Sequence, residues 1–207
     1  LSGLVKYADL IEQNVNNTNV GDFRKVAKSS LNKVAGRYPG IEYSYQEMQY
    51  DQNSNSELPL FIQFPVVYLR ELLEQVFDNA FRFRHPQRPL QIQVTIHQAP
   101  GQLQLAISDN GSGSYDRDSF QQTIQPFYPG SHPHRGIGLG LSCCKAILEK
   151  NGGSINCHCT PDGTITNIHI EEYPKILRSA GAAIQLKLGD QQLGPINDHL
   201  IGLDAEE

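Results

Sequence analysis

Two stretches of alternating apolar and polar residues constrain the fold of this chain most strongly. Residues 90–109, "LQIQVTIHQAPGQLQLAISD", alternate on both sides of a Pro-Gly pair, and "SINCHCT" and "TITNIHI" flank the sequence Pro-Asp-Gly at 161–163. A period of two places the apolar side chains on one face of a strand, and both connecting sequences favour tight turns. The sequence therefore predicts two β-hairpins.

Helical periodicity marks other parts of the chain. Residues 65–84 begin with proline and repeat leucine, valine and phenylalanine every three or four positions, which predicts a helix with one buried face. Residues 1–14 and 20–40 also show helical spacing, and 139–150 predict a helix directly after a glycine run. A strand is expected at 41–50, so helices and strands are mixed.

Composition excludes several classes of function. The chain has 207 residues, 39% of them hydrophobic, which is enough for a real core. A formal net charge of -5 argues against nucleic acid as a partner, and no apolar run is long enough for membrane insertion. The 4 cysteines lack CxxC spacing, which favours a reduced, cytoplasmic setting. In a strand, Cys157 and Cys159 would face away from His158, so we expect core cysteines rather than a metal site.

The glycine run "GIGLGL" at 136–141 favours binding of an anion. The dinucleotide fingerprint would need glycine where Leu141 stands, and the common phosphate loop would need a Gly-Lys pair, which this chain lacks. Glycines still let backbone N–H groups approach an anion, and the helix that follows presents its positive dipole end there. A phosphate site fits, and a plain flexible loop remains the alternative.

Two further motifs occur in chain order before the glycine run. Asn79 lies on the predicted helix 65–84, on a face shared with Glu71, Gln75 and Arg82. Asp109 follows a predicted strand and opens "DNGSG", whose glycines permit a tight turn. Each motif alone is explained by a solvated helix face or by an ordinary turn.

Together, the order and spacing of these motifs resemble a known family. Asn79, "DNGSG" and "GIGLGL" are similar to the N, G1 and G2 boxes of the histidine-kinase-type ATPases, which include gyrase and the large heat-shock chaperones. Phe127 in "QPFYPG" resembles the F box of sensor kinases, and the resemblance covers roughly residues 41–170. It implies an α+β fold, a two-layer α/β sandwich with helices on one face of a mixed sheet, preceded by a helical segment.

The resemblance also implies a division of the chain. Residues 1–40 would be a helical remnant of the dimerisation and phosphoacceptor region, 41–171 the ATP-binding catalytic domain, and 172–207 a C-terminal extension of unknown role. The loop at 112–135, rich in Gly, Ser, Pro and His, would be a mobile lid between the two nucleotide motifs.

The cofactors implied are ATP and Mg²⁺. Asn79 would be the metal ligand, Asp109 would accept a hydrogen bond from the adenine amino group, and the glycines would cradle the phosphates. The residues implied in nucleotide binding are Asn79, Arg82, Asp109, Gly111, Gly113, Phe127, Gly136, Gly138, Leu139, Gly140 and Leu141. Catalysis would involve Asn79 and Gln75, which stands where the ATP-hydrolysing branch has glutamate. Because an amide cannot take a proton, phosphoryl transfer is favoured over hydrolysis.

The function implied is that of a protein-histidine kinase. The chain would be the ATP-binding catalytic domain of a sensor histidine kinase, transferring the γ-phosphoryl group of ATP to a histidine outside this chain. Its implied partners are an upstream phosphoacceptor domain and a response-regulator receiver domain, with a homodimer left open. The alternative is a non-transferring nucleotide-binding module that acts through lid closure and partner contacts.

Overall fold

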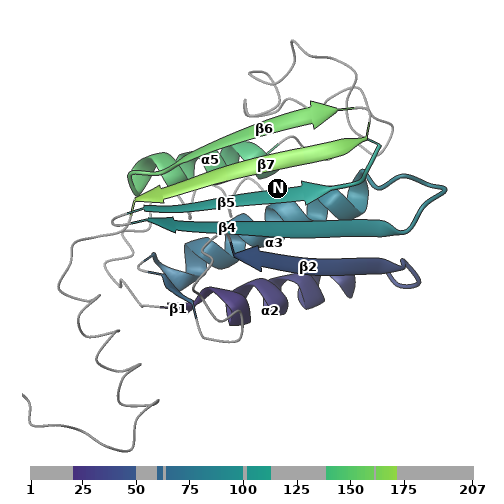
Figure 1. Cartoon of the computed structure of the whole chain (residues 1–207), viewed down its shortest axis with the longest axis horizontal. Coiled ribbons are helices and arrows are strands. Elements are labelled where there is room, and N and C mark those ends of the chain that lie inside the picture. The colour runs from purple at the N-terminus through teal and green to yellow at the C-terminus, as the bar shows by residue number, and fades with distance from the viewer. Residues whose placement is uncertain are drawn as a thin grey trace, which may run out of the picture. The chain divides into compact units, whose positions relative to one another are not determined.

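In the described part of the chain, helices cover one face of a mixed β-sheet (Figure 1). The computed structural model describes residues 21–49, 60–62, 64–99, 102–112, 139–160 and 162–171. The elements in chain order are β1 (Gly21–Asp22), α2 (Phe23–Ala35), β2 (Tyr43–Gln49), β3 (Phe61–Ile62), α3 (Val66–Arg82), β4 (Leu90–Ala99), β5 (Gln102–Asp109), α5 (Gly140–Lys150), β6 (Ser154–Thr160) and β7 (Gly163–Glu171).

The main sheet has five strands in the order β2-β4-β5-β7-β6. The two predicted hairpins are both present, as the antiparallel pairs β4–β5 and β6–β7, and β5 also pairs antiparallel with β7. Strand β2 lies parallel to β4, which makes the sheet mixed. The expected α+β sandwich is confirmed. The short antiparallel pair β1–β3 was not predicted, because two-residue strands carry no periodic signal.

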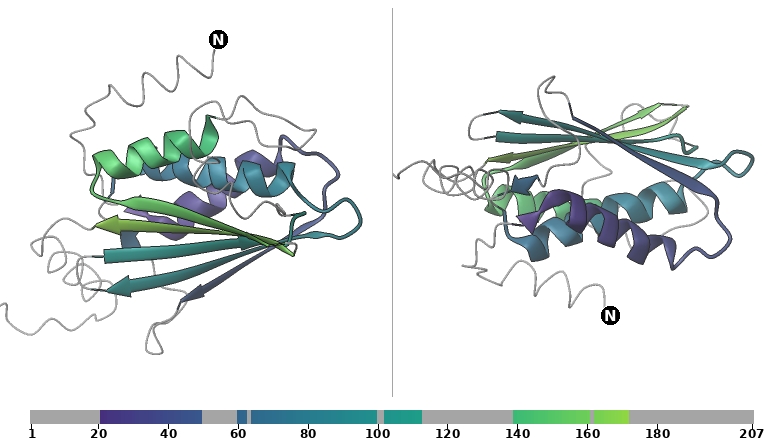
Figure 2. Two further views of the ribbon diagram at one scale, coloured as in Figure 1. Left: turned by 90° about the horizontal axis from the view of Figure 1, so that it is seen from above. Right: turned by 60° about the horizontal axis from the view of Figure 1, so that its bottom comes forward.

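All three described helices pack on the same face of this sheet (Figure 2). Helix α3 is the central one, since it contacts both α2 and α5. It begins after Pro65, whose carbonyl accepts the Leu69 N–H at 2.9 Å, and it ends at Arg82. Its polar face is partly buried: Glu71 is only 8% exposed, whereas Gln75, Asn79 and Arg82 are half-buried.

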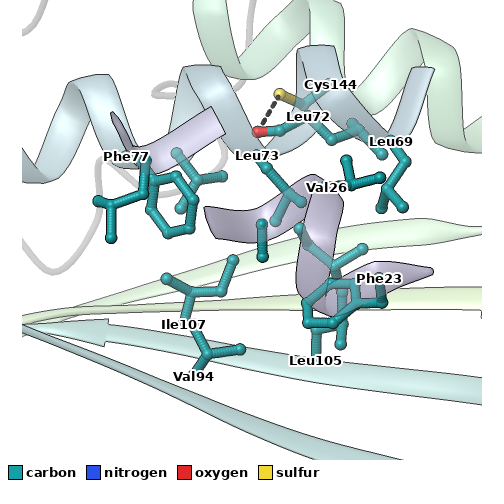
Figure 3. Packing of buried hydrophobic residues seen from close by; sticks show 14 of the residues in the cluster. Phe23, Val26, Leu69, Leu72, Leu73, Phe77, Val94, Leu105, Ile107 and Cys144 are labelled. Atoms are coloured by element: carbon teal, nitrogen blue, oxygen red, sulfur yellow. Dashed lines mark hydrogen bonds between the residues drawn. The ribbon is translucent and has the colours of Figure 1, made fainter. Parts of the chain in front are cut away.

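The core lies between α3 and the inner face of the sheet (Figure 3). Leu72 and Phe77 of α3 and Leu105 and Ile107 of β5 are among its buried side chains. The Cys144 thiol of α5 donates to the Leu72 carbonyl at 4.0 Å, which joins the two helices inside this core. Burial of alternate residues on the strands is what the period-two pattern predicted.

Helix α2 belongs to the same helical layer. Asp22 caps it by accepting the Arg24 N–H at 3.1 Å, and Phe23 is completely buried in the core. Glu74 of α3 joins the two helices through Lys33 at 2.8 Å and Arg37 at 3.2 Å. The domain boundaries expected at 40/41 and 171/172 stay predictions, although α2 shares its core with the sheet.

Several expectations concern residues outside the described ranges. The predicted helix at 1–14, the predicted lid from residue 113 onward and the predicted extension at 172–207 all lie there. Of the helices in the described ranges, none combines the length and the apolar character that crossing a bilayer requires.

Candidate functional site

Gln75 lies on the face of α3 that turns toward α5, and a buried carboxylate orients its side chain. The Gln75 Nε2 donates to Glu71 Oε1 at 2.7 Å, one helical turn earlier. Since this bond fixes which end of the amide faces Glu71, the carbonyl oxygen of Gln75 points away from that carboxylate. Asn79, one turn further along, is half-buried on the same stripe of the helix.

The start of α5 lies directly against Gln75. A Cβ atom placed on Gly140 would come within 2.8 Å of Gln75 Oε1, so only glycine allows this approach without a shift of the amide. Leu139 is the N-cap residue of α5, and its side chain makes no capping hydrogen bond. The first-turn N–H groups of α5, at the positive end of the helix dipole, therefore lie beside the Gln75 carbonyl.

Arg82 lies at the C-terminal end of α3, where Asp78 holds its guanidinium group. Its Nη2 lies 2.6 Å from Asp78 Oδ2, and the same carboxyl group accepts from the Tyr38 hydroxyl at 3.0 Å. Burial acts to lower the pKa of Arg82, but the hydrogen bond with Tyr38 and the charge of Asp78 outweigh it and raise that pKa. The guanidinium is therefore a fixed positive charge at the C-terminal end of α3.

Asp109 ends β5 and forms a turn that adjoins the end of α3. Its Oδ1 accepts the Gly111 N–H at 2.8 Å, and the Ser112 N–H donates to the Phe83 carbonyl at 2.8 Å. A Cβ on Gly111 would lie 2.7 Å from both Asp109 Oδ1 and the Phe83 carbonyl oxygen. The turn can pass this close to α3 only because residue 111 is glycine.

The Asp109 carboxyl is largely shielded from solvent. Burial raises its pKa above the ordinary value, and the backbone N–H groups of Gly111 and Thr164 partly oppose this by stabilising the charged form. Thr164 of β7 is the register partner of Asp109, and Cys159 of β6 is the partner of Thr164. Asp109, Thr164 and Cys159 therefore lie side by side in one row across the end of the sheet, next to the turn that follows Asp109.

The structure brings most of the described candidate residues together around α3. Gln75 meets Gly140 at the start of α5, and the turn of Asp109 and Gly111 meets the helix end. Leu139 is buried and Leu141 is half-buried, so both anchor this start of α5. The remaining predicted nucleotide residues lie outside the described ranges and stay predictions; they are Gly113, Phe127, Gly136 and Gly138.

Two contacts at this site were not foreseen from the sequence. Arg88 binds backbone carbonyls of three residues that are far from it in the chain, and no periodic pattern reports such contacts. Gly163 lies under Asp109, where a Cβ would come within 1.9 Å of the Asp109 carbonyl oxygen. The Pro-Asp-Gly sequence signalled the turn at 163 but not this packing.

The cysteines of β6 follow the alternation of the strand. Cys157 is buried and His158 is exposed, as the period of two predicted. Burial raises the pKa of the Cys157 thiol to about 11, so this thiol is a protonated core group at neutral pH. Across the described residues there is no cluster of three or more His, Cys, Asp or Glu side chains that could hold a metal ion.

Comparison with known sequences identifies the family. The sequence profile described as "Histidine kinase-, DNA gyrase B-, and HSP90-like ATPase" matches residues 66–174, which is more than half of the chain. The sensor protein RprX of Bacteroides fragilis is 29% identical over 100 residues, covering 44% of this chain and 19% of RprX. The sensor histidine kinase component HK1 of Mycobacterium tuberculosis is 29% identical over 121 residues, covering 55% of this chain and 66% of HK1.

Comparison with solved structures agrees with this family. A mycobacterial sensor histidine kinase, MprB, aligns with a TM-score of 0.60 at 25% identity, covering 77% of this chain and 100% of that one. The histidine kinase AdeS of Acinetobacter baumannii aligns with a TM-score of 0.62 at 18% identity, covering 84% and 77%, and shows likeness of fold. The chain thus spans about a fifth of the length of RprX, whereas the alignment covers the whole of the solved MprB chain. From the motif order, the sheet and the profile match together, this chain belongs to the family of histidine kinase-, DNA gyrase B- and HSP90-like ATPases.

Proposed function

We propose that this chain is the ATP-binding catalytic domain of a sensor histidine kinase, and that it transfers the γ-phosphoryl group of ATP to a histidine outside this chain. The observation that carries the proposal is the arrangement around α3. Gln75 meets the start of α5 at Gly140, while the turn of Asp109 and Gly111 meets the end of the same helix. The start of α5, proposed here to bind phosphate, and the Asp109 carboxylate are therefore both next to one helix, which supports the proposal.

Asp109 is proposed to read the adenine base. An ionised carboxylate only accepts hydrogen bonds, so it suits the exocyclic amino group of adenine and disfavours the carbonyl of guanine. The Gly111 N–H donates to Oδ1 of this carboxylate at 2.8 Å, which helps to fix the direction of the group. The triphosphate is proposed to extend toward the first-turn N–H groups of α5, with Arg82 as a nearby cation.

Asn79 is proposed to hold Mg²⁺. Mg²⁺ prefers oxygen ligands, keeps several waters and takes few ligands from the protein when phosphates are present. The residues fit this chemistry, because Gln75 and Asn79 place amide groups one turn apart on α3, beside the start of α5. When bound, the ion would neutralise phosphate charge, and Asn79 would orient it through its amide oxygen.

Gln75 favours transfer to a partner over hydrolysis. Its amide has no basic atom that could deprotonate water, and its NH₂ group is already engaged by Glu71. Its oxygen, next to Gly140, can align a group but cannot accept a proton at neutral pH. Since positioning provides most of phosphoryl-transfer catalysis, the nucleophile would have to come from a partner domain.

The proposed partners follow from this role. An upstream phosphoacceptor domain would supply the histidine, and a response-regulator receiver domain would take the phosphoryl group from it. A cytoplasmic location and a homodimer belong to the same proposal. The second candidate is a nucleotide-binding module without transfer, which the missing base at Gln75 also allows.

Nucleotide binding is tested first by isothermal titration calorimetry. The wild type should bind ADP better than GDP by on the order of tenfold or more, and Asp109→Asn should shrink that gap. Asn79→Ala should abolish the Mg²⁺-dependent part of ATP affinity without loss of helical circular dichroism. Arg70→Ala, on an exposed side of α3 near Ser29, is the control. Equal affinity for ADP and GDP in the wild type would refute the proposed role of Asp109.

Transfer is tested with γ-labelled ATP. A version of the natural protein extended toward its N-terminus should acquire an acid-labile, alkali-stable phosphate, as a phosphohistidine does. Asn79→Ala in the same extended protein should lose the label, whereas Arg70→Ala should keep it. Binding of ATP without any labelling of the extended protein would favour the second candidate.

A further inference from the structure

Arg88 lies between α3 and β4, and its guanidinium group holds two turns at once. Its Nε donates to the Asn110 carbonyl at 2.8 Å, and its Nη2 donates to the Gly111 carbonyl at 3.0 Å. The same Nη2 reaches the Asp162 carbonyl at 3.2 Å, in the turn between β6 and β7. One half-buried side chain therefore ties the turn after Asp109 to the turn before Gly163.

The segment around Arg88 also holds the turn through Asn110. The Asn110 Oδ1 accepts the Gln91 N–H at 2.8 Å, and its Nδ2 donates to the Pro89 carbonyl at 3.1 Å. These bonds fix the middle of the turn, but they do not reach Gly111. Within the described part of the chain, Arg88 is the side chain that donates to the Gly111 carbonyl, at 3.0 Å.

The Asp109 carboxylate is held by two backbone N–H groups, those of Thr164 and Gly111, and Gly111 is the one that lies in the turn. The Gly111 N–H donates to Asp109 Oδ1 at 2.8 Å, and residue 111 is tightly packed against its neighbours. On one side Phe83 would lie 2.7 Å from a Cβ on residue 111, and below it Gly163 is packed against the Asp109 carbonyl. With the Thr164 N–H fixed in the sheet, a movement of Gly111 would therefore change the direction of the carboxylate through Oδ1.

We propose that Arg88 is a positioning residue for base recognition: by holding Gly111, it keeps the Asp109 carboxylate in the direction that distinguishes adenine from guanine. The inference rests on the proposed function, because it gives Asp109 that role. Arg88 acts through the turn and does not touch the base. The planar guanidinium places donors on adjacent carbonyls in a fixed fork, which a lysine ammonium cannot reproduce.

The test compares Kd values for ADP and GDP by calorimetry in the wild type, Arg88→Lys, Arg88→Ala and Arg70→Ala, with urea unfolding of each. In Arg88→Ala, ADP binding should weaken at least tenfold and GDP binding much less, so that the ratio of the two Kd values moves toward one. Arg88→Lys should fall in between, because one ammonium replaces only part of the fork. Arg70→Ala should keep the wild-type ratio, since its guanidinium lies near Ser29, 3.3 Å from the Oγ.

A structural role alone gives a different pattern. If Arg88→Ala and Arg88→Lys lower the free energy of unfolding and weaken ADP and GDP equally, the inference is overturned while the proposed function stands. If the wild type shows no preference for ADP, the proposed role of Asp109 fails and the inference fails with it. A double variant, Arg88→Ala with Asp109→Asn, should show the same ratio as Asp109→Asn alone, because both changes act on one carboxylate.

Discussion

At the scale of single residues, the charge of Asp109, proposed to bind the adenine base, has a cost in stability. Its pKa is raised by burial, so the folded state binds the proton more tightly than the unfolded state does. The stabilisation from the protonated form is therefore complete below the unfolded pKa and is lost as pH rises through the higher folded pKa. At neutral pH, the ionised carboxyl makes the fold less stable than a neutral group would.

The first prediction follows for Asp109→Asn. The free energy of unfolding of the wild type should fall between pH 4 and neutrality by more than that of the variant, since asparagine does not titrate. Urea unfolding of both proteins at a series of pH values measures this difference. Parallel pH profiles would show that Asp109 titrates with the same pKa in the folded and unfolded states.

The second prediction at this scale concerns Gly140→Ala, which should lower the affinity for ATP without lowering the stability of the fold. Alanine has a higher helix propensity than glycine, by roughly 1 kcal/mol in a helix interior, so Gly140→Ala should not destabilise α5. Its Cβ would meet Gln75 Oε1 at 2.8 Å and displace that amide. ATP affinity should fall about tenfold or more, or about 1.4 kcal/mol.

Gly36→Ala is the matched control for Gly140→Ala. Gly36 ends α2 with helical dihedral angles, and a Cβ there would lie 3.5 Å from the Asn32 carbonyl, an ordinary contact. This variant should keep wild-type affinity and stability in calorimetry and urea unfolding. Unchanged ATP affinity in Gly140→Ala would contradict the close contact with Gln75.

At the scale of elements, α2 and α3 are joined by a carboxylate that is almost completely buried. Glu74 is 3% exposed, and its oxygens lie 2.8 Å from Lys33 Nζ and 3.2 Å from Arg37 Nη2. A buried charge without a partner costs several kcal/mol, whereas about half of each cation is in solvent here, which reduces the cost. The network thus sets how these two helices pack.

The third prediction concerns the loss of both cations. Lys33→Met together with Arg37→Met should lower the free energy of unfolding by about 1 to 3 kcal/mol, because Glu74 is left without its cationic partners. Adding Glu74→Gln to that pair should restore part of the loss, since the uncompensated charge is then removed. Lys28→Met, on the exposed side of α2, is the control. Equal stability of the double and triple variants in urea would argue against a charge effect.

At the scale of the whole molecule, the described part of the chain carries the proposed nucleotide site, but none of its histidines lies on a helix as a phosphoacceptor would. Of the histidines in the described ranges, His97, His158 and His169 lie in strands and His85 lies in a loop, so none of these four is on a helix. Gln75 provides no base to activate water. The proposed site can therefore bind ATP without consuming it.

The fourth prediction is that the 207-residue chain alone binds ATP but neither labels itself nor releases phosphate quickly. Incubation with γ-labelled ATP, followed by acid treatment and a phosphate-release assay, measures both activities. An acid-labile phosphate on the isolated chain would show that it contains its own acceptor. Rapid release of phosphate would place it with the ATP-hydrolysing branch of the family.

The sequence by itself determined the elements and the order of the motifs. Alternation marked β4 with β5 and β6 with β7, and helical spacing marked α3, because periods of two and 3.6 are local properties of the chain. Asn79, Asp109 and the glycine run could be recognised for the same reason, since each motif is contiguous. The family, the fold class and the candidate residues could therefore be predicted before any coordinates.

Only the tertiary structure decided how these parts meet. It placed Gly140 against Gln75, Arg88 on the turn after Asp109, and Glu74 between α2 and α3. Each contact joins residues far apart in the chain, and a buried polar group must find its partner wherever packing brings one within reach. Periodicity reports which face of an element is buried, but it does not report which neighbour covers that face. The orientation of Gln75 and of Asp109, on which the proposed chemistry depends, is for this reason a property of the fold.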